Sequence, residues 1–257
     1  ISQSSRVALV TGASRGIGRA ISLQLAADGM FVIGSATNSE GVDKIQLALG
    51  DKGMGVELRL EEPNSIENAL ERIEESCEFP LVLVNNAGAV VGEDLQETTL
   101  ENWKADIDLN LTGHYMLTRL VLPGMVEQSS GAVTNISSVN GIQALGNPAY
   151  SAAKAGLISF TQTLAIEYGP KGIRSNVVLP GTVETPVWKH RVEARPEVFE
   201  LVKSWYPLGR VGQPEDIASA VAFLCADEAG FVNGASLTVD GGLTAGSFRM
   251  IRDMIGK

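Results

Sequence analysis

Short apolar runs alternate with helix-length amphipathic stretches along most of the chain, and this alternation restricts the possible folds more than any other feature. The runs expected to form strands are residues 7–10, 31–34, 56–60, 81–84, 132–137, 175–179 and 236–239. The helical patterns between them cover residues 16–28, 42–49, 65–77, 100–125, 150–168 and 214–225. Several strand runs are apolar throughout, which is typical of strands covered by helices on both faces. We therefore predict an α/β fold in which residues 1–257 form a single doubly wound domain with about seven parallel strands.

Composition and charge exclude several classes of protein. The chain has 257 residues and a formal net charge of −10, and no apolar stretch reaches the roughly 18–20 residues of a membrane span. The negative charge argues against nucleic acid as a partner. Cys77 and Cys225 have no metal-binding or redox spacing and are expected to be free thiols in a reducing compartment. We expect a cytoplasmic protein with no nucleic-acid partner, no membrane segment and no metal site, and Ile1 in place of Met leaves a removed leader open.

Three glycines follow the first apolar run. In Gly12-x-x-x-Gly16-x-Gly18 they permit a tight turn and let the backbone approach a phosphate. The helix that begins near Gly16 directs free N–H groups and its positive dipole end at that anion. A glycine-rich turn alone is weak evidence, because any tight strand–helix connection favours glycine. Its position between the first strand and a helix predicts a binding site for the pyrophosphate of a dinucleotide.

The residues after the second predicted strand indicate which dinucleotide binds. Enzymes that select NAD usually place a carboxylate there to hold the ribose 2′-hydroxyl. Here the strand leads to Ser35-Ala-Thr-Asn38, the first acid is Glu40, and Arg15 lies in the glycine turn. A guanidinium and hydroxyl donors match a 2′-phosphate. We therefore predict NADP(H) as the cofactor, held through Arg15 and Thr37.

A tyrosine and a lysine lie on one face of a predicted helix. Tyr150 and Lys154 have the i, i+4 spacing at the start of the helix. Reduction of a carbonyl needs a proton for the oxygen, and a lysine charge favours the phenolate of a tyrosine whose ordinary pKa is about 10. The spacing is common by chance, and a solvent-facing pair on an amphipathic helix is the alternative. Ser137 and Ser138, which end a strand shortly before Tyr150, strengthen the catalytic interpretation.

With these residues the chain resembles the short-chain dehydrogenase/reductase family over essentially its whole length. The matching motifs are Thr11-Gly-Ala-Ser-Arg-Gly-Ile-Gly18, Asn85-Asn-Ala-Gly88, Asn110, Ile136-Ser-Ser138, Tyr150-x-x-x-Lys154, Asn176 and Pro180-Gly181. The resemblance implies a Rossmann-type domain and a catalytic tetrad of Asn110, Ser138, Tyr150 and Lys154. It further implies that Tyr150 is the acid/base, that Lys154 tunes it and binds the ribose, and that Asn110 supports a proton relay.

The same resemblance assigns the contacts to the dinucleotide. Besides Tyr150 and Lys154, the expected cofactor-binding residues are Gly12, Ser14, Arg15, Gly16, Ile17, Gly18, Thr37, Leu60, Asn86, Ala87, Gly88, Pro180, Gly181, Val183 and Thr185. The family commonly has Asp or Asn where this chain has Arg59, and arginine has no acceptor for the adenine amine. The contact there is expected from the backbone of Leu60. Family members form tetramers through the two long helices, so a homotetramer is expected here.

The position of the serine departs from the family pattern. The serine usually precedes the tyrosine by thirteen residues, which selects Ser137, whereas the match of Ser138-Val-Asn-Gly141 selects Ser138 with a loop one residue shorter. Side chains alternate along a strand, so only one of the two hydroxyls can face the substrate. Ser138 is favoured, and Ser137 is the alternative.

Residues 186–206 interrupt the passage from the sixth predicted strand to the last predicted helix. They carry Trp188, Phe199 and Trp205 among several charges. We expect a lid over the substrate site, with an ordinary surface pair of helices as the alternative. The residues expected to contact the substrate are Ser138, Asn140, Tyr150, Val187 and Trp188.

Within the family, the N-terminal half most resembles 3-oxoacyl-carrier-protein reductases. Those enzymes dock an acidic carrier on basic residues near the active-site mouth, where this chain reads Glu127-Gln-Ser-Ser130, with Lys171 and Arg174 nearby. We therefore predict an NADP(H)-dependent carbonyl reductase that acts reversibly on a small-molecule ketone or secondary alcohol. A 3-oxoacyl-carrier-protein reductase is the second hypothesis, and a non-catalytic NADP(H)-sensing protein is the third.

Overall fold

Parallel strands form one sheet in the order β3-β2-β1-β4-β5-β6-β7 in the computed structural model, which describes residues 6–92 and 94–256. The strands are β1 (Val7–Val10), β2 (Phe31–Ala36), β3 (Gly53–Glu57), β4 (Val82–Asn85), β5 (Gly131–Ile136), β6 (Ile173–Pro180) and β7 (Ser236–Val239). The order reverses between β1 and β4, and in open α/β sheets ligands bind at such a switch point, beyond the carboxyl ends of the strands. The predicted fold class is confirmed.

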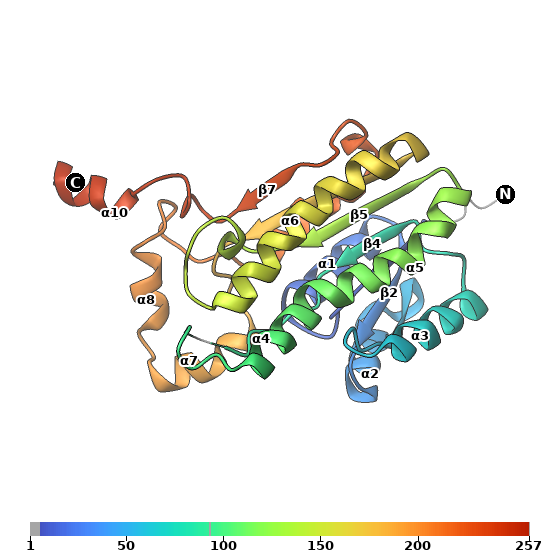
Figure 1. The fold of residues 1–257 in the computed structure, drawn as a ribbon, viewed down its shortest axis with the longest axis horizontal. Coiled ribbons are helices and arrows are strands. Elements are labelled where there is room, and N and C mark those ends of the chain that lie inside the picture. The colour runs from blue at the N-terminus through green and yellow to red at the C-terminus, as the bar shows by residue number, and fades with distance from the viewer. Residues whose placement is uncertain (1–5, 93, 257) are drawn as a thin grey trace.

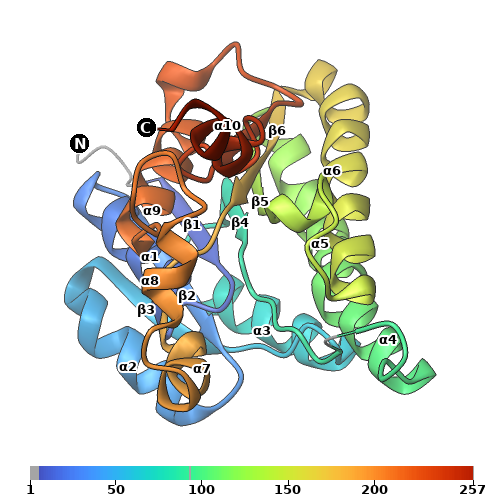
Figure 2. The same cartoon turned by 90° about the vertical axis from the view of Figure 1, so that its left-hand side faces the viewer.

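Helices cover both faces of this sheet (Figure 2). One layer consists of α1 (Gly16–Ala27), α2 (Ser39–Leu49) and α9 (Pro214–Cys225), and the other of α3 (Pro63–Ser76), α5 (Gly113–Glu127) and α6 (Pro148–Tyr168). Alternate residues of β1 supply the two cores, because Ala8 and Val10 face the first layer while Val7 and Leu9 face the second. No helix within the described ranges is long and apolar enough to cross a membrane.

The remaining helices lie at the ends of the layers. They are α4 (Leu100–Ile107), α7 (Lys189–Ala194), α8 (Val198–Lys203) and α10 (Phe248–Ile255). Figure 1 shows α7, α8 and α10 at the end of the molecule toward which the arrows of β5 and β7 point. This is the end at which the switch point predicts a ligand site.

β3 begins at Gly53, earlier than the apolar run expected at 56–60. Gly53 pairs with Val32 of β2, and a Cβ on Gly53 would lie 2.1 Å from the Val32 carbonyl oxygen. Only glycine fits this close approach. The strand therefore starts with residues that carry no apolar pattern, which is why the sequence placed it too late.

The helix predicted at 100–125 is interrupted by a π-helical turn. The turn (Asp108–Thr112) joins α4 to α5 and contains Asn110. Such turns frequently occur at functional sites. At the start of α5, a Cβ on Gly113 would lie 2.6 Å from Leu60 Cβ, so the helix packs directly on the segment after β3. The Leu60 side chain is consequently buried in the core.

α5 also buries a histidine. His114 is fully buried, its imidazole faces the Ala87 carbonyl, and neither ring nitrogen has a hydrogen-bond partner of good geometry among the described residues. Burial, together with the charge of Lys154, lowers the pKa of His114 to about 3, although the Ala87 carbonyl opposes this shift. The imidazole is therefore neutral in the folded protein near neutral pH.

Replacement of His114 by leucine should make folding less sensitive to acid. In the unfolded chain a histidine takes up a proton below its ordinary pKa of about 6.5, whereas the folded protein does so only near pH 3. The contribution of His114 to stability is thus complete above pH 6.5 and is lost as the pH falls toward 3. Urea unfolding at several pH values between about 4 and 7 should give a shallower pH dependence for His114→Leu than for the wild type. Equal slopes would contradict a neutral, buried imidazole.

Candidate active site

The glycine turn joins β1 to α1 at the carboxyl edge of the sheet. Gly12 and Gly16 have left-handed φ angles of 66° and 55°, which glycine adopts readily. Gly18 packs against the turn so closely that a Cβ there would lie 2.2 Å from the Gly12 carbonyl oxygen. Arg15 is the N-cap residue of α1 and its side chain makes no cap hydrogen bond, so the first N–H groups of the helix can bind an anion. The turn fits a pyrophosphate.

The end of β4 lies against this turn. Thr11 Oγ1 accepts hydrogen bonds from the backbone N–H groups of Asn86 and Ala87, both at 2.9 Å, and Asn86 Nδ2 donates to the Thr11 carbonyl at 2.8 Å. A Cβ on Gly12 would lie 3.1 Å from Ala87 Cα. Two predicted cofactor-binding segments, the glycine turn and residues 86–88, are therefore in contact.

The segment after β2 borders the same turn. Gly12 N donates to Ser35 Oγ at 3.3 Å. Arg15 and Thr37 are both exposed. The first acidic residue, Glu40, lies in α2 and is paired with a lysine of its own helix at 2.6 Å. Residues 35–39 thus present hydroxyl and amide groups to a ligand and no carboxylate.

β6 brings a third predicted segment to this edge. A Cβ on Gly16 would lie 3.3 Å from Thr185 Cγ2, so Thr185 is adjacent to the glycine turn. Val183 forms an isolated bridge with Gly212. In this bridge, Gly212 N donates to the Thr182 carbonyl and Glu184 N donates to the Gly212 carbonyl. The N–H and C=O of Val183 itself therefore point away from Gly212 and can contact a ligand.

α6 carries the predicted acid/base pair. Lys154 is 3% exposed, and its Nζ donates to the carbonyl of Ile136 at the end of β5, at 2.9 Å. The same amine lies 5.5 Å from the centroid of the Tyr150 ring. The Ser138 hydroxyl lies close enough to the Tyr150 hydroxyl to lower the pKa of the phenol. Three members of the predicted tetrad thus meet where β5 ends.

Burial dominates the ionisation of this pair. It lowers the pKa of Lys154 to about 7. It also raises the pKa of Tyr150, while the adjacent Ser138 hydroxyl lowers that pKa and the negative charge of Asp106 raises it. The sequence predicted that the lysine charge would favour the phenolate, but burial has the largest effect on the pKa of Tyr150 and acts in the opposite direction. The site favours a protonated phenol next to an amine that releases its proton near neutral pH.

The two candidate serines make different contacts. Ser137 Oγ donates to the backbone carbonyl of Lys154 at 2.8 Å and so attaches α6 to the end of β5. Ser138 lies beside the phenol of Tyr150, and its Oγ also accepts from Asn140 N at 3.1 Å. The extended backbone turns successive side chains to opposite sides. Ser138, rather than Ser137, is the hydroxyl next to the predicted acid.

Asn110 is fully buried in the π-helical turn. Its Nδ2 donates to the Ala89 carbonyl at 2.8 Å and to the Asp106 carbonyl at 2.9 Å, whereas its Oδ1 has no hydrogen-bond partner within the described part of the chain. A Cβ on Gly88 would lie 2.7 Å from Asn110 Oδ1 and 3.4 Å from Lys154 Nζ. Glycine at position 88 therefore leaves room for both groups beside the predicted cofactor segment.

A chain of buried amides and hydroxyls beneath the site was missed by the sequence reasoning. Asn85 Nδ2 donates to Thr118 Oγ1 at 2.9 Å and to Asn135 Oδ1 at 2.8 Å, and Asn135 Nδ2 donates to Thr161 Oγ1 at 2.8 Å. These bonds link β4 and β5 to α5 and α6. The available signal was an asparagine near the end of each of two otherwise apolar strands.

Residues 186–206 fold into a 3₁₀ turn (Pro186–Trp188), α7 and α8. The rings of Trp188 and Phe199 lie 5.4 Å apart. Tyr206 is buried in a small separate core, and its hydroxyl accepts from the N–H after Gly181 at 2.6 Å. Val187 is exposed. The segment thus packs partly on itself at the ligand-binding edge.

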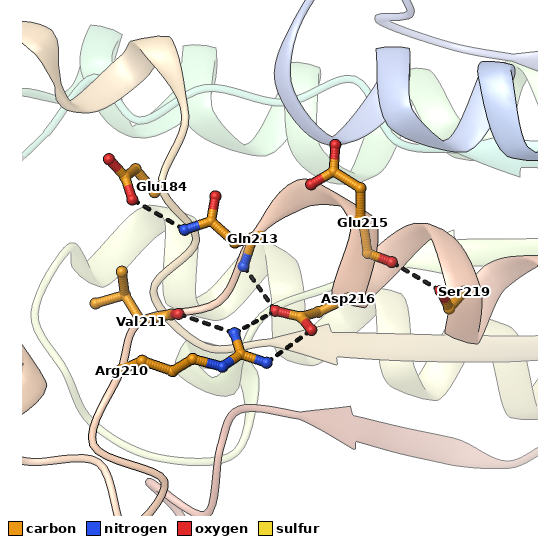
Figure 3. Close-up of polar contacts among 7 residues, drawn as sticks. All are labelled: Glu184, Arg210, Val211, Gln213, Glu215, Asp216 and Ser219. Atoms are coloured by element: carbon orange, nitrogen blue, oxygen red, sulfur yellow. Dashed lines mark hydrogen bonds and ion pairs between the residues drawn. The ribbon is translucent and has the colours of Figure 1, made fainter.

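The residues on either side of this segment are hydrogen-bonded to each other close to the start of α9 (Figure 3). Gln213 Nε2 donates to Glu184 at 2.9 Å, and Gln213 N donates to Asp216 at 2.7 Å. Arg210 forms a bidentate ion pair with Asp216, at 2.6 and 2.8 Å. Fixed ends suit a segment that moves as a unit, and the lid function stays a prediction.

The cations considered for a carrier-protein surface have other contacts. Arg174 donates to three backbone carbonyls at and after the end of α9, at 2.9 to 3.3 Å. Lys171 Nζ lies 4.4 Å from the centroid of the Tyr168 ring. Within the described residues, no group of three or more His, Cys, Asp or Glu side chains could hold a metal ion.

The chain is similar to known proteins over most of its length. A family model described as Enoyl-(Acyl carrier protein) reductase matches residues 12–244. The 3-oxoacyl-[acyl-carrier-protein] reductase FabG of Escherichia coli is 42% identical over 240 residues, which cover 93% of this chain and 97% of that protein.

Solved structures give the same result. An oxidoreductase of the short-chain dehydrogenase/reductase family from Burkholderia thailandensis is 43% identical, with a TM-score of 0.93 and 99% of both chains covered. A variant of actinorhodin polyketide ketoreductase with NADPH is 35% identical, with a TM-score of 0.88 over 93% of this chain and 97% of that chain. The family model, the Escherichia coli relative and the solved structures agree, and the chain belongs to the short-chain dehydrogenase/reductase family of oxidoreductases.

Proposed function

We propose that this chain is an NADP(H)-dependent enzyme that interconverts a small ketone and a secondary alcohol, with Tyr150 as general acid and base. The observation that carries the proposal is the meeting of Tyr150, Ser138 and Lys154 at the end of β5, close to Gly88. A phenol, a hydroxyl and a buried amine at the ligand-binding edge of a parallel sheet suit proton transfer beside a dinucleotide.

Each side chain has a distinct role in the reductive direction. Tyr150 gives its proton to the carbonyl oxygen, and Ser138 donates a hydrogen bond to that oxygen as charge develops on it. When bound, the nicotinamide supplies hydride to the adjacent carbon. Lys154, whose pKa burial lowers to about 7, binds the ribose and can return a proton toward Tyr150 near neutral pH. Asn110 supports this relay with its buried Oδ1, which has no hydrogen-bond partner among the residues that the structure describes.

Loss of the Tyr150 hydroxyl tests the mechanism. Tyr150→Phe keeps the ring and should bind NADPH with a Kd within about twofold of the wild type, while kcat falls by about 10²–10⁴-fold because the proton donor is gone. NADPH consumption and fluorescence titration measure the two quantities. Tyr168→Phe makes the same chemical change at the far end of α6 and should leave both unchanged. A fully active Tyr150→Phe enzyme would discard the proposed acid.

The phosphate-bearing dinucleotide is supported by the charges around the turn. Arg15→Ala should weaken NADPH binding about ten- to hundredfold, because a charge-assisted hydrogen bond contributes about 1.5–3 kcal/mol. Binding of NADH, which lacks the 2′-phosphate, should change little. Arg19→Ala, at an exposed position of the same helix, is the matched control. Equal kcat/KM values for NADH and NADPH in the wild type would contradict the proposed preference.

The surroundings of Tyr150 support a small free substrate. Val90, Val91, Ile142 and Val187 are exposed apolar side chains on segments near the site. A chain with a net charge of −10, whose Arg174 is used internally, would attract an acidic carrier protein only weakly. The name of the Escherichia coli relative favours a second candidate, reduction of a 3-oxoacyl group on a carrier protein.

A substrate panel separates these candidates. NADPH consumption is measured with free ketones, with 3-oxoacyl thioesters and with a 3-oxoacyl-carrier protein. We expect kcat/KM to be at least about tenfold higher for a free ketone than for the carrier substrate, which corresponds to about 1.4 kcal/mol in the transition state. The opposite order supports the carrier-protein reductase. If the protein binds NADPH but turns over no substrate of the panel, the non-catalytic sensor becomes the favoured hypothesis.

We also propose a cytoplasmic homotetramer. Tyr115 and Leu120 on α5 and Ile166 on α6 are exposed apolar side chains on the two helices expected at the subunit contacts. Such side chains suit burial against a symmetric copy. Light scattering measures the oligomeric state directly.

A further inference from the structure

Asp106 is a buried carboxylate that the proposed mechanism does not use. It lies in α4 and is 1% exposed. Val91 N donates to one of its oxygens at 3.0 Å, and Gly92 N donates to the other at 3.2 Å. Burial of a carboxylate is unfavourable unless hydrogen bonds compensate for the lost water. These two charge-assisted bonds therefore tie α4 strongly to the turn after β4.

The π-helical turn that follows α4 holds the other end of the turn after β4. Asn110, four residues after Asp106, donates to the Ala89 carbonyl at 2.8 Å. Residues 89–92 are thus anchored at both ends by side chains of α4 and of the π-helical turn that follows it. Between the anchors, Val90 and Val91 are 45% and 48% exposed, and Val91 lines a hollow together with Leu100 and Leu109. A fixed backbone that presents apolar side chains suits one wall of a pocket for an apolar group.

A third anchor comes from α6. Asn147, the residue before that helix, donates from Nδ2 to the Gly92 carbonyl at 3.0 Å. Its φ of 52° is left-handed, a strained conformation that persists only where the surroundings hold it. A Cβ on Gly92 would lie 2.6 Å from Thr98 Oγ1, so the turn is also closely packed. Because Tyr150 lies in the first turn of α6, the turn and the phenol are held in one fixed arrangement.

We propose that Asp106 is a positioning residue for the substrate: together with Asn147, its carboxylate fixes residues 89–92 as a rigid apolar wall beside Tyr150. This rests on the proposed function, because the wall is assigned to the substrate of that reaction. The chemistry requires a carboxylate. Both oxygens of Asp106 accept a backbone N–H, whereas a carboxamide can accept only one and sets a donor against the other.

The charge of Asp106 has a second consequence. The groups that face Tyr150 or its neighbouring amine are Asp106 from α4, Lys154 from α6, Ser138 after β5 and the neutral His114 from α5. Of these, Asp106 raises the pKa of the Tyr150 phenol. The protonated phenol, which ketone reduction needs, is thereby favoured over the phenolate, which alcohol oxidation needs.

Asp106→Asn tests both effects. It should raise KM for a ketone by about tenfold or more, because one anchor of the wall is lost, and leave the Kd of NADPH unchanged. The rise of alcohol oxidation with pH should move to lower pH, because the phenol ionises more readily. Asp108→Asn removes the same charge at an exposed position of the same stretch and should change neither quantity. Unchanged KM and pH profile in Asp106→Asn, or equal changes in Asp108→Asn, overturn the proposal.

Asn147→Gly separates the wall from the charge. Glycine keeps the left-handed backbone and removes the donor to the Gly92 carbonyl. KM should rise as in Asp106→Asn, while the pH profile should stay that of the wild type. An unchanged KM in Asn147→Gly overturns the anchored wall, and it does so even if Asp106→Asn fails to fold.

Amide hydrogen exchange at Val91 and Gly92 tests the anchor without a substrate. Exchange should be at least about tenfold faster in Asp106→Asn than in the wild type or Asp108→Asn, because both protecting bonds are weakened. Unchanged exchange overturns the anchor. Faster exchange in a chain whose wild type reduces no ketone refutes the proposed function and leaves the anchor standing.

Discussion

The buried amine of Lys154 is the contact on which the arrangement of the site depends. It donates to the carbonyl of Ile136, while Ser137, the next residue, donates to the backbone carbonyl of Lys154. α6 is therefore attached to the end of β5 at two points. Because an unpaired charge in the interior is strongly unfavourable, these contacts leave the helix little freedom to slide or rotate. Tyr150, one turn before the lysine, is thereby held against Ser138.

The rest of the interior supports this attachment. The amide and hydroxyl chain from Asn85 through Asn135 to Thr161 joins the two central strands to α5 and α6 beneath the site. A hydrogen-bonded polar chain in the core favours one relative position of the elements that carry it, since a displacement would break several buried hydrogen bonds at once. Across the switch point itself, Thr11 ties the glycine turn to the Asn86–Ala87 segment. Both halves of the predicted site are thus built on the strand ends rather than on mobile loops.

The sequence predicted most of this arrangement where local pattern and tertiary structure agree. β1, β7 and α9 lie at the predicted residues because their apolar periodicity is also their burial pattern. The prediction was wrong about the start of β3, because Gly53 is there to allow close approach to the backbone of β2 and a glycine carries no apolar signal. The choice between Ser137 and Ser138 needed the actual backbone direction after β5. Asp106 and His114 could not be found from spacing, because a charged and a polar residue on a helix usually face solvent, and only the packing of α4 and α5 shows that both are buried.

The ionisation of Tyr150 and Lys154 could not be predicted from the sequence either. Four-residue spacing predicted that the lysine charge acts on the phenol, but the sequence does not reveal how deeply either group is buried. In the structure, burial governs both groups: it lowers the pKa of Lys154 to about 7 and raises the pKa of Tyr150. The neutral phenol is thus the resting form, and the amine is the group poised to exchange a proton.

A crystal structure with bound NADP⁺ tests the central claim most directly, because the account requires the Lys154-held helix to present Tyr150 to the cofactor. It predicts the pyrophosphate at the glycine turn, the ribose at Lys154 and the nicotinamide between Thr185 and the Tyr150 hydroxyl. A nicotinamide ring on another side of the sheet, or a Lys154 amine with no contact to the cofactor, would contradict it.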